Sequence, residues 1–300
     1  SPNNTVDDVF ANYYKAVHDA NFYLENCLGL TFDDWKNTDG FQDTYAAYLN
    51  QRHEVRFLRA FYYFELVKRY GNVPLITKTL TKEEAARAQP ASAEKVLQFV
   101  IDECTDVAQA LPDKPTALPG GPANMQRVSK GVALALKSRA TLYLASPLFN
   151  PSADAARWQT AAAAAYELIS QAAAFGYALD NDYQNLFGAI NNQSPEVILC
   201  RPEGKTTHFE AANYPIGVER GSGNTCPTEN LVSAYEMKDG TAFDWNNAAQ
   251  AADPYKNRDP RLQMTIVCNG SKWPGAVPVE TFFGGKNGQP LRNATTTGYY

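Results

Sequence analysis

One stretch of the chain combines helical spacing of apolar residues with a sharp end. Between residues 56 and 70, apolar side chains recur at three- and four-residue spacings, which places them on one face of a helix. Gly71 can adopt the left-handed conformation that closes a helix, and Pro74 cannot continue one. The pattern predicts an amphipathic core helix over 43–70. Its apolar residues are Phe57, Ala60, Phe61, Phe64, Leu66 and Val67, and its charged residues are Arg56, Arg59, Glu65, Lys68 and Arg69.

The same periodicity predicts further helices on both sides of this one. They are expected at 5–28, 93–110, 127–146 and 154–175. Ser92, three residues before Lys95, is placed to cap one of them, and loops rich in Pro and Gly separate the helices. Consecutive helices at this spacing resemble tetratricopeptide-like hairpins, although no strict period of about 34 residues can be read. The predicted fold class is mainly α, with a tetratricopeptide-like scaffold.

The periodicity and composition of the sequence change after residue 176. Helical periodicity fades, and Gly, Asn, Pro and Thr become more frequent. The apolar run 197–200 predicts an isolated strand, and 228–238 predicts a short helix capped by Thr228. We therefore expect a helical scaffold over 1–176 and a loop-rich, strand-poor ligand-binding region over 177–300, packed on the scaffold. Loops held by a rigid scaffold are where binding residues concentrate.

Composition narrows the class of protein. Hydrophobic residues make up 44% of the 300 residues and charged residues 20%, as in ordinary globular chains. The net charge of −5 argues against nucleic acid as a partner, because phosphates require a basic face. The five cysteines are scattered, which predicts buried, unpaired thiols. The first residues lack the pattern of a signal peptide, so we expect any targeting segment to be missing from this chain.

No catalytic motif is complete. His53-Glu54 begins like the zinc-binding helix of a metalloprotease, but Phe57 stands where the second histidine belongs. The acidic pairs, such as Asp33 with Asp34, are neighbours in sequence and do not face each other across a bond, as glycosidase carboxylates do. We therefore expect a protein that is not an enzyme and that needs neither metal nor cofactor.

Binding features are concentrated in the second region. An aromatic ring on a held loop offers a flat apolar face to a sugar, while nearby polar groups can bond to hydroxyls. Each ring could equally serve to anchor the loops to the scaffold. The expected ligand contacts are Phe209, Tyr214, Arg220, Trp245 and Trp273.

Several distinctive motifs follow one another along the chain. The first is the opening helix, followed by Tyr70-Gly71-Asn72-Val73-Pro74-Leu75. The others, in chain order, are Val128–Leu144, Ser194–Leu199, Pro227–Gly240, Arg258–Leu262 and the ending Thr296–Tyr300. These motifs, spread over residues 56–300, resemble in kind and order those of the RagB/SusD-like outer-membrane nutrient-binding lipoproteins of Bacteroidetes.

The resemblance implies a non-catalytic lid subunit that captures oligosaccharide and delivers it to a SusC-like TonB-dependent transporter. It also implies an outer-membrane location on the extracellular face, through an N-terminal lipid anchor that this chain lacks. The family's proteins are longer, so we interpret the chain as incomplete at both ends. Ligand residues vary within the family, and the resemblance transfers none of them.

Three alternatives stay open at this point. Some members of the family bind peptides instead of oligosaccharides. A tetratricopeptide-type adaptor for protein segments would also be built from helical hairpins. A glycoside hydrolase would need two facing carboxylates, for which the sequence offers no support.

Overall fold

The chain divides into two compact units. The structure, a computed structural model, describes residues 9–124, 126–188, 193–201, 206–272, 278–291 and 297–300. The helical unit consists of Ser1–Asn181 and Ile190–Pro202, and the loop-rich unit consists of Asp182–Ala189 and Glu203–Tyr300. Each unit is described by itself below.

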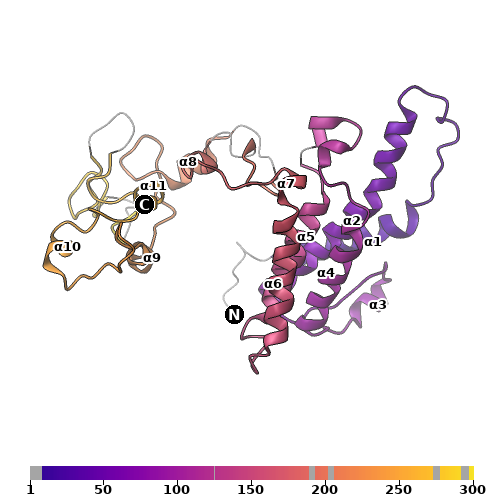
Figure 1. The fold of residues 1–300 in the computed structure, drawn as a ribbon, viewed down its shortest axis with the longest axis horizontal. Coiled ribbons are helices and arrows are strands. Elements are labelled where there is room, and N and C mark those ends of the chain that lie inside the picture. The colour runs from indigo at the N-terminus through magenta and orange to yellow at the C-terminus, as the bar shows by residue number, and fades with distance from the viewer. Residues whose placement is uncertain (1–8, 125, 189–192, 202–205, 273–277, 292–296) are drawn as a thin grey trace. The chain divides into compact units, whose positions relative to one another are not determined.

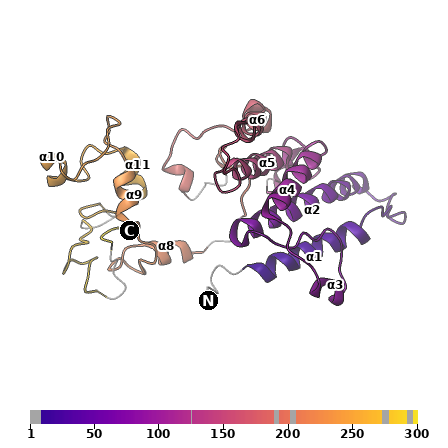
Figure 2. The same cartoon turned by 90° about the horizontal axis from the view of Figure 1, so that it is seen from below.

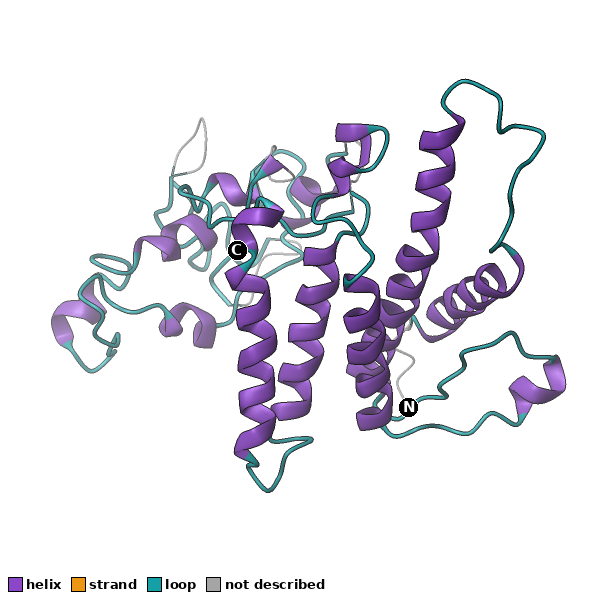
Figure 3. Cartoon of the chain, turned by 45° about the vertical axis from the view of Figure 1, so that its right-hand side comes forward, coloured by secondary structure: helices purple, strands orange, loops and turns teal. Residues whose placement is uncertain are grey.

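Long helices that pack on their sequence neighbours build the helical unit (Figure 1; Figure 2). Helix α1 contacts α2, α2 contacts α4, α4 contacts α5, and α5 contacts α6. This succession of neighbouring pairs confirms the predicted mainly α class, and Figure 3 draws only helices and loops along the described chain. The helices are α1 (Phe10–Asn26), α2 (Phe41–Tyr70), α3 (Lys82–Ala86), α4 (Ala93–Ala108), α5 (Lys130–Ala145), α6 (Ala155–Ser170) and α7 (Ala172–Phe175). Short 3-10 turns occur at η1 (Pro115–Ala117) and η2 (Gly121–Asn124).

The capping residues explain where the helices begin and end. The Ser92 side chain accepts a hydrogen bond from the Lys95 N–H at 3.2 Å, as its position predicted. Gly71 has a φ of 68°, and its N–H donates to the Val67 carbonyl at 2.9 Å, which closes α2.

Two sequence-based expectations need revision. The helix expected over 154–175 is interrupted at Gln171, so that α6 and α7 are separate. The strand expected at 197–200 is wrong, because those residues follow turns and form no ladder. A strand needs a partner for its backbone groups, and apolar side chains alone do not supply one. The short extended piece at Val73 does find one, in a single antiparallel bridge with Ala91.

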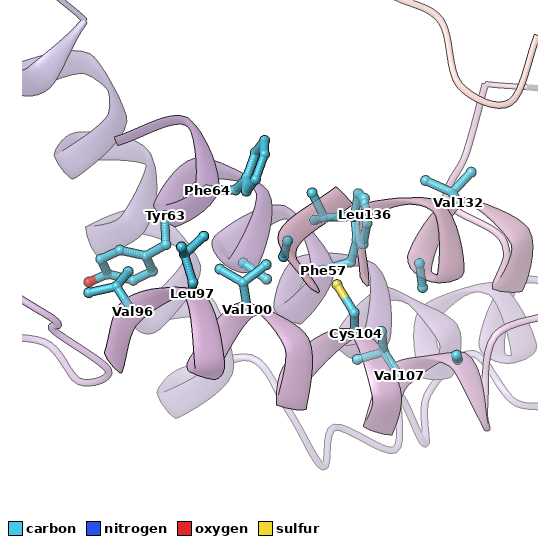
Figure 4. Close-up of a cluster of buried hydrophobic side chains, with 14 of the residues drawn as sticks. Phe57, Tyr63, Phe64, Val96, Leu97, Val100, Cys104, Val107, Val132 and Leu136 are labelled. Atoms are coloured by element: carbon cyan, nitrogen blue, oxygen red, sulfur yellow. The ribbon is translucent and has the colours of Figure 1, made fainter. Parts of the chain in front are cut away.

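The core of the helical unit lies between α2, α4 and α5 (Figure 4). Phe57 and Phe64 of α2 are each 1% exposed and meet Val96, Val100 and Cys104 of α4 and Leu136 of α5. Phe61, in contrast, is only partly buried. Helix α2 is therefore the central element of this unit, in agreement with its predicted role.

Helix α2 is buried on more sides than its sequence pattern indicated. Arg59 and Glu65, which the pattern placed among the polar positions, are 8% and 7% exposed. Helices α1, α4 and α5 all contact α2, and its buried residues are concentrated between Phe57 and Val67. Each buried charge has partners: Arg59 donates to Asn21 and Glu103, and Glu65 accepts from Lys68 and Arg69.

The loop-rich unit has a small core of its own. Val232, Leu262, Ile266, Cys268 and Tyr299 pack together, with Tyr235 and Tyr255 against them. The Tyr299 hydroxyl donates to Glu229 at 2.6 Å, and Val267 and Tyr300 exchange two backbone hydrogen bonds. Its helical elements are η3 (Asn185–Phe187), α8 (His208–Asn213), α9 (Glu229–Ala234), α10 (Ala248–Ala252) and α11 (Pro260–Thr265).

Candidate ligand-binding surface

The segment 208–224 carries three of the expected ligand contacts. It begins with the short helix α8 and then folds back on itself through backbone hydrogen bonds. The N–H groups of Ser222, Gly223 and Asn224 donate to the carbonyls of Ala211, Tyr214 and Ala212. Gly221 faces the carbonyl of Pro215 so closely that a Cβ atom there would lie 2.2 Å from the oxygen. Because the Pro215 carbonyl lies so close, only a glycine fits at position 221.

The three side chains on this segment differ in exposure. Phe209 is 74% exposed, which is unusual for a phenylalanine and leaves its ring open to a ligand. Tyr214 is partly buried at the end of α8. Arg220 adopts a φ of 61° and lies beside Glu219, with 3.8 Å between Nε and the carboxylate. An aromatic face and a guanidinium are therefore available along one short loop.

Trp245 is held by a chain of ring contacts. Its ring meets Phe243 edge to face, with 4.9 Å between centroids, and the Arg258 guanidinium lies 4.1 Å from the Phe243 centroid. Arg258 also donates to the carbonyls of Val232, Tyr235 and Pro254. Burial lowers the pKa of Arg258, yet an arginine stays charged. Trp245, which is 48% exposed, therefore packs on a phenylalanine ring that is covered by a buried cation bonded to three carbonyls.

The expected contacts do not form one cluster. Phe209, Tyr214 and Arg220 share a segment, whereas Trp245 lies just before α10, and α8 and α10 are at different ends of the loop-rich unit in Figures 1 and 2. Trp273 lies outside the described residues.

Sequence reasoning did not identify a polar depression in the same unit. It has a volume of about 660 Å³, within the range typical of small-molecule sites. The only sequence feature that marks it is the tripeptide Asn269-Gly270-Ser271, which predicts a turn but does not indicate a binding site. The depression, as we call it below, is lined by Asp253, Tyr255, Lys256, Gln263, Cys268, Asn269, Gly270, Ser271 and Lys272.

The walls of the depression are firmly held. Gly270 has a φ of 82°, which allows the turn in which the Ser271 N–H donates to the Cys268 carbonyl at 3.1 Å. The Cys268 N–H donates in turn to the Ser271 hydroxyl. Tyr255 rests edge to face against Tyr299, and burial raises the pKa of Tyr255. Burial also raises the pKa of the Cys268 thiol to about 11, so this thiol is neutral near pH 7.

A hollow in the helical unit has a different character. It has a volume of about 310 Å³ and lies between α1 and the segment 74–88. Phe10, Tyr14, Val17, Ile76 and Leu80 give it mostly apolar walls. Such walls suit sugar hydroxyls less well than the mixed lining of the depression, because hydroxyls lose hydrogen bonds there.

Candidate metal ligands can be compared only in the part of the chain that the structure describes. Within those residues, no group of three or more His, Cys, Asp or Glu side chains could hold a metal ion. His53, the start of the incomplete zinc motif, lies on α2 with Phe57 in the core.

Two family models match the chain in order. The model described as "Starch-binding associating with outer membrane" matches residues 1–142, and the model described as "SusD family" matches residues 195–300. The chain belongs to the SusD family. The resemblance seen in the ordered motifs is thereby confirmed, and the SusD family is one associated with the outer membrane. Among the described residues, no helix is both long and apolar enough to cross a bilayer.

Solved SusD-like structures share the fold. A SusD-like protein from Bacteroides fragilis NCTC 9343 is 26% identical, with a TM-score of 0.78, and the match covers 98% of this chain and 56% of that one. A SusD-like carbohydrate binding protein from the same strain is 25% identical, with a TM-score of 0.72, covering 91% and 48%. A laminarin binding SusD-like protein is 25% identical, with a TM-score of 0.51, covering 64% and 37%.

A curated relative shows the same pattern of coverage. SusD-like protein P25 from Formosa agariphila is 21% identical over a match 290 residues long, which covers 88% of this chain and 49% of the relative. The chain therefore spans about half the length of the relatives it matches.

The family motifs have structural roles in the loop-rich unit. Glu229 of the motif 227–240, Leu262 of the motif 258–262 and Tyr299 of the ending all meet in or beside the small core. Arg258 of the motif 258–262 donates to two carbonyls of the motif 227–240 and to the Pro254 carbonyl in the loop between these two motifs. These residues hold the unit together, which leaves other positions, such as Phe209 and Asn269, exposed at its surface.

Proposed function

We propose that this chain is the ligand-capturing part of a non-catalytic, cell-surface glycan-binding protein. In this proposal the protein acts as the lid of a SusC-like TonB-dependent transporter and delivers oligosaccharide to it. The observation that carries the proposal is the ordered match of two SusD family models over 1–142 and 195–300, the first described as starch-binding and associated with the outer membrane. Among the relatives, one solved structure is described as carbohydrate binding and another as laminarin binding.

The loop-rich unit supports capture of a sugar. Sugars are bound where an aromatic face lies near hydrogen-bonding side chains that are already held in place. Phe209 and Trp245 offer exposed rings on loops fastened by backbone bonds and by Arg258. Tyr214 and Arg220 lie on the same segment as Phe209. We retain these four residues, with Trp273, as the proposed contacts.

Alanine variants test the proposed contacts. Isothermal titration with a panel of neutral and acidic oligosaccharides identifies a ligand for the unmodified chain. Phe209→Ala and Trp245→Ala are then expected to weaken binding by about five- to a hundredfold each, because loss of a stacked ring removes roughly 1–3 kcal/mol. Phe187→Ala is the matched control, since this ring is 70% exposed but lies outside the segments proposed to bind. Unchanged affinity in both test variants would contradict this choice of contacts.

The transporter partnership has its own test. The protein, expressed at full length in its native membrane and extracted in mild detergent, is expected to co-purify with a large outer-membrane barrel. A monomer under these conditions would contradict the lid role while leaving glycan binding intact. Binding of peptides and of no glycan in the titration panel would favour the peptide-binding alternative and overturn glycan capture.

A further inference from the structure

The charge of the depression differs in sign from that of the whole chain. Two lysines, Lys256 and Lys272, line it against one acid, Asp253, which leaves one net positive charge. The chain as a whole carries −5. Cys268 adds no charge near pH 7, because burial keeps its thiol protonated. The depression is thus a locally cationic hollow on an acidic protein.

The two lysines are available to a ligand. Both are exposed, and neither forms an ion pair with any residue that the structure describes. The backbone N–H of Lys256 donates to the Asp253 carbonyl at 3.2 Å, which positions the backbone of this lysine. An ammonium group without a carboxylate partner in the protein can bind the carboxylate of a ligand, because no existing ion pair has to be broken first.

The remaining lining suits a hydroxylated ring. The Asn269 Oδ1 accepts from the Thr281 N–H at 3.1 Å, which orients the amide and leaves its Nδ2 without an acceptor among the described residues. Asp253 and Gln263 can accept from hydroxyls, and Tyr255 adds an aromatic side chain backed by Tyr299. A volume of about 660 Å³ accommodates more than a bare anion.

We propose that the depression is a subsite for an acidic sugar unit, whose carboxylate is held by Lys256 and Lys272 while Asn269, Asp253 and Gln263 bond to its hydroxyls. The proposal rests on the proposed function, because it names the substrate class of the same glycan-binding unit. It goes further in requiring that the captured glycan contain uronic acid.

Paired ligands isolate the carboxylate. Oligogalacturonate and its methyl ester have the same ring and hydroxyls, but the ester carries no charge. The unmodified chain is titrated with both, and with neutral glucan oligosaccharides, at low and at high salt. The acid is expected to bind about tenfold more tightly than the ester at low salt, and the difference should shrink as salt screens the exposed lysines.

Matched variants isolate the lysines. Lys256→Gln and Lys272→Gln are each expected to weaken binding of the acid by about fivefold and to leave binding of the ester unchanged. Lys256→Arg and Lys272→Arg, which keep the charge, should retain most of the preference. Lys238→Gln removes the same charge from an exposed position of the same unit outside the depression, and should change neither affinity. Circular dichroism verifies that every variant is folded.

The outcomes separate this inference from the proposed function. Equal binding of acid and ester, or a preference that survives both glutamine changes, overturns the acidic-sugar subsite and leaves glycan capture in place. Binding of neutral glucans alone has the same consequence. Failure of every oligosaccharide in the panel to bind overturns both.

Discussion

At the scale of single residues, the helical unit depends on charges buried between helices. Arg59 of α2 donates to Asn21 of α1 at 2.8 Å and to Glu103 of α4 at 3.1 Å. Glu103 also accepts from Arg56 at 2.6 Å. One carboxylate therefore compensates two guanidinium groups, and three helices are joined by polar bonds that run through their contact.

Glu103 and Asp106 provide a matched pair, because both accept from Arg56 and they differ in burial. Their side chains are 11% and 63% exposed. Glu103→Gln should lower the free energy of unfolding by about 3 kcal/mol, since it leaves Arg59 buried without an anion. Asp106→Asn should cost less than about 1 kcal/mol. Urea denaturation measures both, and equal costs would show that burial does not set the strength of this network.

The loop-rich unit shows the same dependence on single residues. Arg258 is 6% exposed and bonds to three carbonyls, and its guanidinium supports the ring that touches Trp245. In the sequence, Arg258 stands out only as the first residue of the motif 258–262. In the structure it joins the loop that carries an expected ligand contact to the small core.

At the scale of elements, close packing decides where small residues are needed. Helix α5 contacts α4, α6 and α7, and Gly131 near its start is buried. A Cβ atom at Gly131 would lie 2.5 Å from the ring of Tyr177 and 2.8 Å from its hydroxyl oxygen. Tyr177 is itself held, edge to face against Phe175 and within 3.4 Å of the Ser129 hydroxyl.

Gly131→Ala reverses an ordinary expectation. Within a helix, alanine is favoured over glycine by about 1 kcal/mol. Here the added methyl group must displace the Tyr177 ring, so the change should instead lower the free energy of unfolding by about 1–2 kcal/mol. In a Tyr177→Leu background the same change should be neutral or stabilising. A stabilising effect with Tyr177 in place would show that the ring yields freely.

Elements also show how far sequence patterns reach. Long helices were predictable because a 3.6-residue period over many turns is a strong signal, and Ser92 and Thr228 cap helices as predicted. The short helices α8, α10 and α11 lie in the region expected to be loops, since five or six residues carry too little periodicity. The strand at 197–200 was wrong because a strand depends on a partner elsewhere in the chain.

At the scale of the whole molecule, the described residues form two separate hydrophobic cores. Among the residues that the structure describes, the large cluster contains none beyond 200, and the small one begins at Val232. Each proposed ligand contact that the structure describes lies in the loop-rich unit. Ligand binding should therefore act on the second core and leave the first unchanged.

Hydrogen exchange followed by mass spectrometry tests this division. With saturating oligosaccharide, the amides of residues 206–272 are expected to exchange more slowly, because binding to the folded unit suppresses its opening. Amides of α2, α4 and α5 should exchange as before. Protection confined to these helices would place the ligand on the helical unit and contradict the proposed contacts.

The sequence by itself determined the helical class, the main helices, their caps and the family, because these depend on periodicity, local hydrogen bonds and ordered motifs. Only the tertiary structure decided that Arg59 and Glu65 are buried, since that depends on three helices surrounding α2. It also separated Trp245 from Phe209 and assembled the depression from turns at 253–256 and 268–272 with α11. Such a hollow has no sequence period, because its walls are distant in the chain and meet only when the small core packs.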